Sequence, residues 1–409
     1  MPYSDKQYLQ SLTKNQQLEL MKVDFFSNKK LNVIEQDNAY VLPPKFGSED
    51  SAWFIGGVLD SNKNYIEESG QRAYGEKDRV YGQYDFDESS ANYINEEVVY
   101  FNFYLSQWGH YLLDVIGRLW YISKHTEYKI IYTTDIHGNN HIKNNFLQLL
   151  KLLGINENRL IFINEVTKFK KVIIPETSIL VAKYWTKEYK QIIDKLVDNA
   201  IGENILKKNR KIYCSRKHFN EIRSLSFNEN TIEQVYRNNG YEIVYMEELD
   251  LTKQIRLLNE CREVVCISGT LVHNAMFIRN KRCNFTVINK TYKVNPNIYL
   301  TNQLSDATFT FVDAYLAPLP VSIGKGPFML VISDEFIHYC KDNSLILDTN
   351  INRKVSKKVL IEYYIEYMKK YRKKIFANKK VSTSGFEEYD VTNKEISNHY
   401  QNQLSLLNK

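Results

Sequence analysis

The chain has 409 residues, of which 43% are hydrophobic and 25% charged. This composition excludes a disordered chain. The length is too great for one ordinary hydrophobic core. The net charge of +6 is small, so we expect no nucleic-acid partner. No stretch reaches the roughly 18 apolar residues of a membrane-spanning helix. Residues 1–20 lack the apolar core of a signal peptide, and the five cysteines form no CxxC pair. We therefore expect a soluble cytoplasmic protein with reduced, mostly buried thiols.

Residues 1–95 are the least regular part of the sequence. They contain polar turns and short apolar runs, such as residues 52–59. We predict an irregular N-terminal extension with a few strands.

From residue 97, short apolar runs alternate with segments of helical periodicity. Strands are predicted over residues 97–106, 129–134, 159–164 and 171–176, and helices over residues 109–123, 142–154 and 186–203. This alternation is typical of a parallel sheet covered by helices on both faces. It predicts a first Rossmann-like domain over residues 96–205.

The polar stretch 202–211 interrupts this pattern and is predicted to link two domains. A second alternation follows, with strands over residues 211–216, 241–246, 263–268 and 284–289, and helices over residues 228–240, 252–261 and 270–280. We predict a second Rossmann-like domain over residues 206–345, facing the first across a cleft. Ligands of such sheets bind beyond the carboxyl ends of the strands.

The first candidate motif lies in residues 107–120. His110 and Asp114 are four residues apart and therefore share one face of the predicted helix. A carboxylate beside an imidazole raises its basicity and fixes its tautomer, which suits a general base. The alternative is structural: His110 caps the helix or packs in the core, and Asp114 pairs with Arg118.

The second motif lies in residues 213–229. A predicted strand ends at Ser215 and Arg216, Arg223 lies in a polar loop, and Asn228 and Glu229 begin a predicted helix. Guanidinium groups at the carboxyl end of a strand match the oxygens of a diphosphate. The alternative is a solvated basic loop.

The third motif lies in residues 266–277. A predicted strand ends at Ser268, Gly269 forms the turn, and a helix is predicted to begin near Thr270. Free N–H groups and the positive end of the helix dipole would form an anion site there. The alternative is an ordinary capped connection between strand and helix.

These three motifs, in this order, resemble family 61 glycosyltransferases over roughly residues 97–315. The matching residues are Gly109, His110, Asp114, Tyr213, Ser215, Arg216, Arg223, Asn228, Glu229, Gly240, Gln254, Ile255, Gly269, Thr270, Leu271, Asn274 and Phe277. One departure is Ser268, because many members have a histidine immediately before this glycine.

The resemblance implies a GT-B-like fold and inverting, metal-independent transfer from a nucleotide sugar. Bacterial relatives are often associated with capsule or other surface polysaccharides. We expect a UDP-linked donor, a glycan or lipid-linked glycan acceptor, and no cofactor. The rival hypothesis is a non-catalytic nucleotide- or polysaccharide-binding protein with a degenerate site at Ser268.

Within this hypothesis, His110 supported by Asp114 removes the proton of the acceptor hydroxyl, or Asp114 does so directly. Arg216, Arg223 and the helix start at Thr270 stabilise the leaving diphosphate. Glu229 and Asn274 are candidates for contacts to the ribose or base. The full set of expected donor contacts is Ser215, Arg216, Arg223, Asn228, Glu229, Ser268, Gly269, Thr270 and Asn274.

No metal site is expected. Asp85 and Asp87 form a DxD pattern, but they lie far from the nucleotide-like segment, and we interpret them as a chance match. His137 and His141 lack a third ligand nearby, which favours a polar turn.

Residues 346–409 contain a basic segment, 353–380, with eleven Lys or Arg residues and two Glu residues. Its apolar residues recur at helical spacing. One interpretation is a basic amphipathic helix that touches anionic lipid at the inner face of the membrane. The other is a C-terminal helix that packs back across the N-terminal domain and exposes a basic face.

Overall fold

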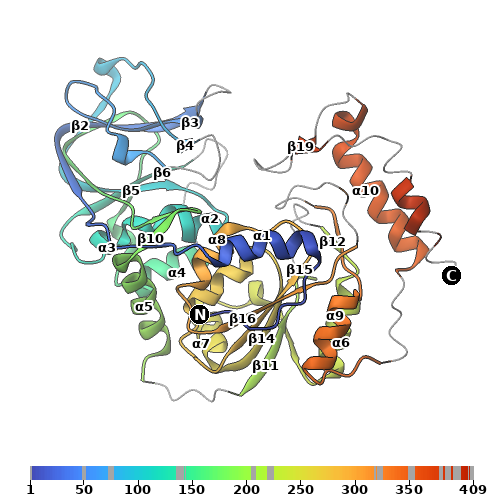
Figure 1. The fold of residues 1–409 in the computed structure, drawn as a ribbon. Coiled ribbons are helices and arrows are strands. Elements are labelled where there is room, and N and C mark those ends of the chain that lie inside the picture. Colours follow the sequence, from blue (N-terminus) through green and yellow to red (C-terminus); the bar gives the residue numbers. More distant parts are fainter. Residues whose placement is uncertain are drawn as a thin grey trace. The chain divides into compact units, whose positions relative to one another are not determined.

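The computed structural model shows a mixed α/β protein (Figure 1). It describes residues 2–47, 52–71, 78–134, 142, 144–203, 209–218, 225–316, 319, 326–348, 355–376, 381–382, 388–389, 398–403 and 405. The chain forms two compact units, and each is described by itself. The N-terminal unit comprises Asp24–Asn204 and Asp250–Arg256, and the C-terminal unit comprises Met1–Val23, Ile205–Leu249 and Leu257–Lys409.

A seven-stranded mixed sheet forms the framework of the N-terminal unit, in the order β4-β3-β2-β8-β5-β6-β7. Its strands are β2 (Val33–Phe46), β3 (Ala52–Leu59), β4 (Asp78–Val80), β5 (Asn92–Tyr104), β6 (Lys129–Thr134), β7 (Leu160–Phe162) and β8 (Thr167–Pro175). The strands predicted from residue 97 onward pair in parallel, with Val98 opposite both Lys129 and Val172. The predicted parallel sheet is thus confirmed for β8-β5-β6-β7.

The first 95 residues do not form an irregular extension. Strand β2 runs antiparallel to β8 along most of its length, and β3 and β4 continue the sheet beyond it. Ala39, Val41 and Val58 are fully buried in its core. The pattern was hard to recognise because Pro43 and Pro44 interrupt β2, where the pairing with β3 shifts register.

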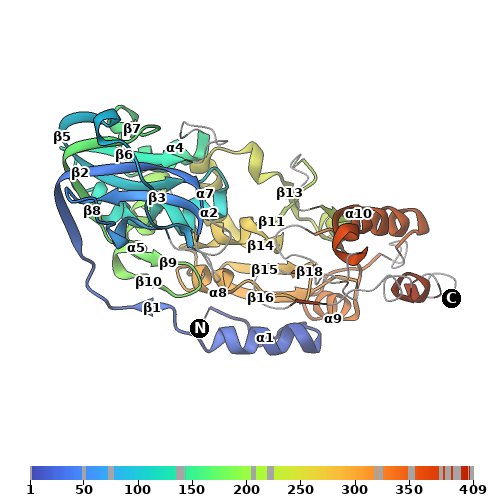
Figure 2. The same ribbon diagram turned by 90° about the horizontal axis from the view of Figure 1, so that it is seen from above.

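The first 23 residues belong to the C-terminal unit. Tyr3 and Tyr8 bridge in parallel to Phe309 and Val312 of strand β16 (Thr308–Asp313). Helix α1 (Ser11–Met21) then contacts helix α8 (Pro296–Asn302), as Figure 2 shows. The chain start therefore completes an edge of a sheet whose other strands lie more than 180 residues further along.

A five-stranded, fully parallel sheet forms the core of the C-terminal unit, in the order β13-β11-β14-β15-β16. Its other strands are β11 (Arg210–Cys214), β13 (Glu242–Val244), β14 (Cys261–Ile267) and β15 (Asn284–Asn289). Numbered along the chain from β11, the order is 2-1-3-4-5, a doubly wound arrangement with a switch point between β11 and β14. The four predicted strands of this region are confirmed.

Helices α6 (Glu229–Asn238) and α7 (Leu251–Glu260) follow the predicted segments within a residue or two. Helix α9 (Asp334–Asp342) packs against the parallel sheet through Phe336 and Cys340. All five cysteines are buried and free, so the expectation of buried thiols is confirmed. Burial raises the pKa of each of these thiols.

The basic C-terminal segment contains helix α10 (Lys357–Phe376). Its buried face, formed by Leu360, Tyr363, Tyr364 and Tyr367, packs with strand β17 (Phe328–Met329) of the same unit. Its lysines 357, 358, 369 and 370 are exposed. The helical prediction is confirmed, but the apolar face packs on the C-terminal unit and not across the N-terminal domain, as one interpretation of the sequence had it. No helix in the described part of the chain is long and apolar enough to span a membrane.

Candidate active site

The segment that contains His110 is helical, as predicted, but its turns are uneven. Helix α2 (Trp108–His110) leads into a wide π turn over Tyr111–Val115, and a tighter 3-10 turn over Ile116–Arg118 precedes α3 (Leu119–Ile122). A π turn exposes main-chain carbonyls that a regular helix would satisfy, and such turns are frequent at functional sites.

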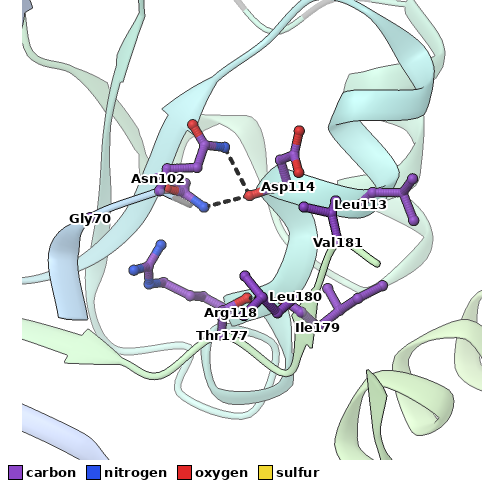
Figure 3. Close-up of a pocket in the computed structure, with 10 residues that line it drawn as sticks. Gly70, Asn102, Leu113, Asp114, Arg118, Thr177, Ile179, Leu180 and Val181 are labelled. Atoms are coloured by element: carbon purple, nitrogen blue, oxygen red, sulfur yellow. Dashed lines mark hydrogen bonds between the residues drawn. The ribbon is translucent and has the colours of Figure 1, made fainter. Parts of the chain in front are cut away.

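Side chains from elsewhere in the N-terminal unit donate hydrogen bonds to these carbonyls. The Asp114 carbonyl accepts hydrogen bonds from Asn102 Nδ2 at 2.8 Å and Gln71 Nε2 at 2.9 Å (Figure 3). The Tyr189 hydroxyl donates to the Leu112 carbonyl at 2.9 Å. Three buried donors therefore hold the wide turn in place.

His110 and Asp114 meet as their spacing predicts. His110 Nδ1 lies 2.7 Å from Asp114 Oδ2, and the two side chains are 41% and 2% exposed, respectively. The carboxylate can only accept, so a neutral imidazole carries its proton on Nδ1 and keeps a lone pair on Nε2. Arg79 Nη2 lies 3.8 Å from the same carboxylate oxygen, which adds a positive charge beside Asp114. The pair is a buried carboxylate with an accessible base.

Arg118 does not pair with Asp114, in contrast to the structural alternative. Its guanidinium donates instead to the carbonyls of Pro175, Phe101 and Glu68. The side chain is 1% exposed. The π and 3-10 turns between the two residues change their angular spacing from that of a regular helix, which explains the difference.

A small cavity of about 20 Å³ lies beside these residues (Figure 3). Gln71, Asn102, Asp114, Arg118 and Thr177 contribute to its lining. This volume holds about one water molecule and no sugar. The cavity therefore belongs to the scaffold behind the π turn.

Asn102→Leu is expected to lower the free energy of unfolding by about 1–3 kcal/mol, because the buried Asp114 carbonyl loses one of its two donors. Urea denaturation measures this. The matched control is Asn92→Leu at the start of the same strand, where the amide makes an exposed hydrogen bond to Glu165. That change should stay within about 0.5 kcal/mol of wild type. Equal stability of the two variants would contradict the scaffold role of Asn102.

The second and third motifs come together at the switch point of the C-terminal unit. Cys214 of β11 lies opposite Cys266 of β14, so the segments that follow these strands begin side by side. Arg216 lies in one of them and Gly269 in the other. The helix that the sequence predicted over residues 270–280 is an eight-residue 3-10 helix over Thr270–Phe277.

Two basic side chains, those of Arg216 and Lys290, face Gly269. A Cβ atom at this glycine would lie 3.6 Å from Arg216 Nη1 and 3.8 Å from Lys290 Nζ. The backbone of Gly269 is extended, so the missing side chain supplies space and not a special conformation. The glycine thus leaves room for a small anionic group within reach of both basic side chains.

Lys290 was missed by the sequence analysis. It directly follows β15, the neighbour of β14 on the side away from β11, and it is 5% exposed. Its Nζ lies 4.3 Å from the centre of the Phe328 ring. Burial and the nearby Arg216 hold its pKa well below the usual range, and Glu229 opposes this shift. The sequence signal that could have identified Lys290 is its position just after a predicted strand, because Arg216 occupies the same kind of position after β11.

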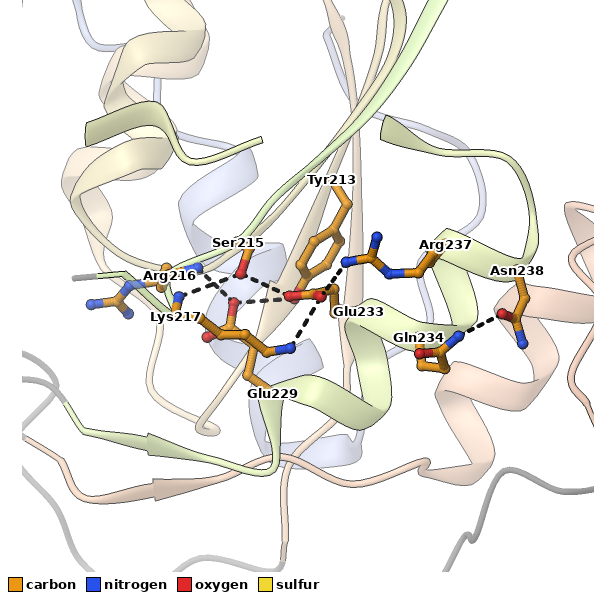
Figure 4. Close-up of polar contacts among 9 residues, drawn as sticks. All are labelled: Tyr213, Ser215, Arg216, Lys217, Glu229, Glu233, Gln234, Arg237 and Asn238. Carbon is orange, nitrogen blue, oxygen red and sulfur yellow. Dashed lines mark hydrogen bonds and ion pairs between the residues drawn. The ribbon is translucent and has the colours of Figure 1, made fainter. Parts of the chain in front are cut away.

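Acidic residues of α6 position the segment that carries Arg216 (Figure 4). Glu229 Oε1 accepts from the Arg216 N–H at 2.8 Å and from the Tyr213 hydroxyl at 3.4 Å. Burial raises the pKa of the Glu229 carboxyl. Ser215 Oγ donates to Glu233 Oε2 at 2.8 Å, and Lys217 pairs with Glu233 Oε1 at 3.0 Å. Ser215 and Glu229 therefore have partners within the protein, and their contact with a donor stays a prediction.

The other expected donor contacts differ in their surroundings. Asn228 donates to the Leu330 carbonyl and accepts from the Thr231 hydroxyl. Asn274 is buried, whereas Ser268 and Thr270 are half-buried at the turn. Arg223 lies outside the described residues. Donor contact by these residues stays a prediction.

Among the residues that the structure describes, no group of three His, Cys, Asp or Glu side chains is placed to hold a metal. Asp87 caps a short 3-10 turn by accepting from Ser89 N at 3.0 Å. His137 and His141 lie outside the described residues.

A known protein family matches a segment that includes both the His110–Asp114 pair and the switch point of the C-terminal unit. The family model described as Glycosyltransferase 61 matches residues 108–285, from the first residue of α2 to the beginning of β15. No curated protein matches the chain. The match contains the His110–Asp114 pair and the carboxyl ends of β11 and β14. Residues 108–285 therefore match the glycosyltransferase 61 family, a family of glycosyltransferase enzymes.

Proposed function

We propose that this enzyme inverts the anomeric centre of a nucleotide sugar as it transfers the sugar to a carbohydrate hydroxyl. The C-terminal unit binds the donor, and the N-terminal unit acts on the acceptor, in the GT-B-like arrangement expected from the sequence. The observation that carries the proposal is the pair of basic side chains, Arg216 and Lys290, facing Gly269 at the switch point of a doubly wound sheet. A diphosphate is the nucleotide-sugar group that such a site fits.

His110 is the general base in this proposal, and Asp114 orients it. Exposure favours this assignment over direct action by Asp114, because His110 is 41% exposed and Asp114 only 2%. His110 Nε2 takes the proton of the acceptor hydroxyl as its oxygen attacks the anomeric carbon. The bond from that carbon to the diphosphate oxygen breaks, and Arg216 and Lys290 stabilise the charge that develops there.

The wider role is proposed from the family resemblance. We propose a UDP-linked donor and an acceptor glycan, free or lipid-linked, in the synthesis of a bacterial surface polysaccharide. Five free, buried cysteines support a reducing compartment, and we propose the cytoplasm. The exposed lysines of α10 support contact with anionic lipid at the inner face of the membrane.

A thermal-shift screen of nucleotide sugars and their nucleoside diphosphates tests donor binding. A ligand that binds the folded state raises the unfolding temperature by mass action. The proposal predicts a shift with one nucleotide sugar and its diphosphate, followed by release of that diphosphate when an acceptor glycan is added. Binding without turnover across a broad acceptor panel would support the non-catalytic alternative.

Activity is expected to survive an excess of EDTA, because we propose that cationic side chains balance the diphosphate charge that a metal ion balances in other enzymes. The measurement is the rate of nucleoside diphosphate release before and after chelation. Complete loss of activity, restored by manganese or magnesium, would contradict this prediction and would direct attention to Asp85 and Asp87.

A further inference from the structure

Trp53 is an exposed aromatic residue that lies outside the three sequence motifs and outside the family match. It belongs to β3 and is 59% exposed, whereas the other three tryptophans of the chain are half-buried. Strand β4 runs parallel to β3, with Phe54 opposite Val80. Because side chains alternate along a strand, Trp53 and Arg79 lie side by side on the other face of this strand pair.

Arg79 connects the exposed ring with the candidate general base. Its guanidinium lies over the Trp53 ring, 5.3 Å from the ring centre, which is within the range of a cation–π contact. Nη2 of the same group lies 3.4 Å from His110 Nδ1 and 3.8 Å from Asp114 Oδ2. The Arg79 side chain is only 12% exposed, which restricts its movement. A single side chain therefore separates an exposed indole ring from the His110–Asp114 pair.

The surroundings of Trp53 favour an uncharged ligand that has an apolar face and polar edges. The positive charge of Arg79 lies beside the carboxylate of Asp114, so the two charges largely balance each other. A second cation is disfavoured at a ring that the guanidinium already covers on one face. The apolar C–H face of a sugar ring can pack on the exposed indole, while its hydroxyl groups bond to neighbouring polar groups. A carbohydrate therefore fits this surface.

We propose that Trp53 is an acceptor-binding residue, and that a sugar ring of the acceptor glycan stacks on its exposed indole. This inference rests on the proposed function, since it places the attacking hydroxyl of the same glycan at His110. The Arg79 guanidinium lies between the indole and His110, so we assign the stacked ring to the sugar next to the one that attacks. Trp53 selects the acceptor and takes no part in proton transfer.

The test is steady-state kinetics of the full chain with pairs of methyl glycosides as acceptors. The shorter acceptor of each pair is a single sugar, and the longer one is a disaccharide that contains the same sugar at its non-reducing end. The donor is the nucleotide sugar identified by thermal shift, at a saturating concentration, and release of the nucleoside diphosphate gives kcat and the acceptor KM. The variants are Trp53→Ala and Trp53→Phe, which keeps an aromatic ring.

Trp53→Ala is expected to raise the KM for the disaccharide by about tenfold, the effect of losing one well-packed aromatic contact. Its kcat should change by less than about threefold, because the stacking contact is the same in the ground state and in the transition state. The KM for the single sugar should stay near the wild-type value. Trp53→Phe should retain part of the affinity for the disaccharide. Calorimetry of the disaccharide, in the presence of the nucleoside diphosphate, measures the same loss without turnover.

Phe46→Ala is the matched control. Phe46 is also 59% exposed, but it pairs with Phe54 and stacks on its ring, so it lies on the face of the sheet opposite to Trp53. Its loss should leave the KM for both acceptors at the wild-type value. Thermal unfolding checks that each variant is folded.

Unchanged KM and unchanged affinity for the disaccharide in folded Trp53→Ala would overturn the inference and leave glycosyl transfer intact. An equal rise in KM for both acceptors would also overturn it, and so would a loss confined to kcat. Disaccharide binding that depends on Trp53 but gives no transfer would contradict only the catalytic part of the proposed function. Failure of wild type to bind or glycosylate any acceptor would contradict the proposed function itself, and the inference about Trp53 would fall with it.

Discussion

His110→Ala is expected to lower turnover per folded molecule by about 10²–10⁴-fold, the usual contribution of a general base. The reason is that Nδ1 is held 2.7 Å from the buried Asp114 carboxylate, which leaves Nε2 to accept a proton. Affinity for the nucleoside diphosphate should barely change, because we assign diphosphate binding to residues of the C-terminal unit. The measurements are steady-state kinetics and calorimetry on the same preparation.

His125→Ala is the matched control for this variant. His125 is also partly exposed and also paired with a carboxylate, with its Nδ1 3.2 Å from Glu127 Oε1. Its loss should leave turnover near wild type. Near wild-type turnover in folded His110→Ala would remove His110 from the mechanism. If Asp114→Asn were inactive at the same time, the alternative in which Asp114 is the base would gain support.

Arg216→Ala is expected to weaken nucleoside diphosphate binding by about 1.5–3 kcal/mol, the range for a hydrogen bond to a charged group. Its guanidinium faces the space beside Gly269, and Glu229 fixes its main chain. Arg216→Lys should give an intermediate loss, because it keeps the charge and loses the planar fork. On sequence grounds we expect a similar loss for Arg223→Ala. Calorimetry measures all three affinities.

Arg210→Ala is the control for Arg216→Ala. Arg210 lies at the opposite end of β11, where its guanidinium pairs with Glu242 at 2.6 Å and Glu260 at 2.8 Å. Its loss should leave diphosphate affinity unchanged. The donor site would be wrong if the folded Arg216→Ala protein bound diphosphate as tightly as wild type.

The sequence predicted the parallel strands well. Residues 129–134 and 284–289 form β6 and β15 with the predicted bounds. Parallel strands are short, continuous apolar runs between turns, and that pattern is local. Strand β2 was missed because its pairing with β8, about 130 residues away, is not visible in its own periodicity. The bridges of Tyr3 and Tyr8 to β16 are also long-range and are not visible in the local sequence pattern.

Contacts of the candidate site were predictable from the sequence only where the interacting residues are close together along the chain. The four-residue interval between His110 and Asp114 predicted their contact correctly. The π turn was not predictable, because Asn102, Gln71 and Tyr189 hold it from other parts of the chain. Lys290 belongs to no motif, and it became a candidate only when the strand order placed β15 beside β14.

We propose that the enzyme forms a glycosidic bond with inversion at the anomeric carbon. Nuclear magnetic resonance of the reaction in EDTA, with the nucleotide sugar identified by thermal shift and a panel of carbohydrate acceptors, determines the configuration of the product. We predict a new glycosidic linkage whose anomeric coupling shows the configuration opposite to that of the donor. A product that retains the donor configuration would rule out an inverting enzyme, and a bound nucleotide sugar that yields no linkage with any acceptor would rule out glycosyl transfer.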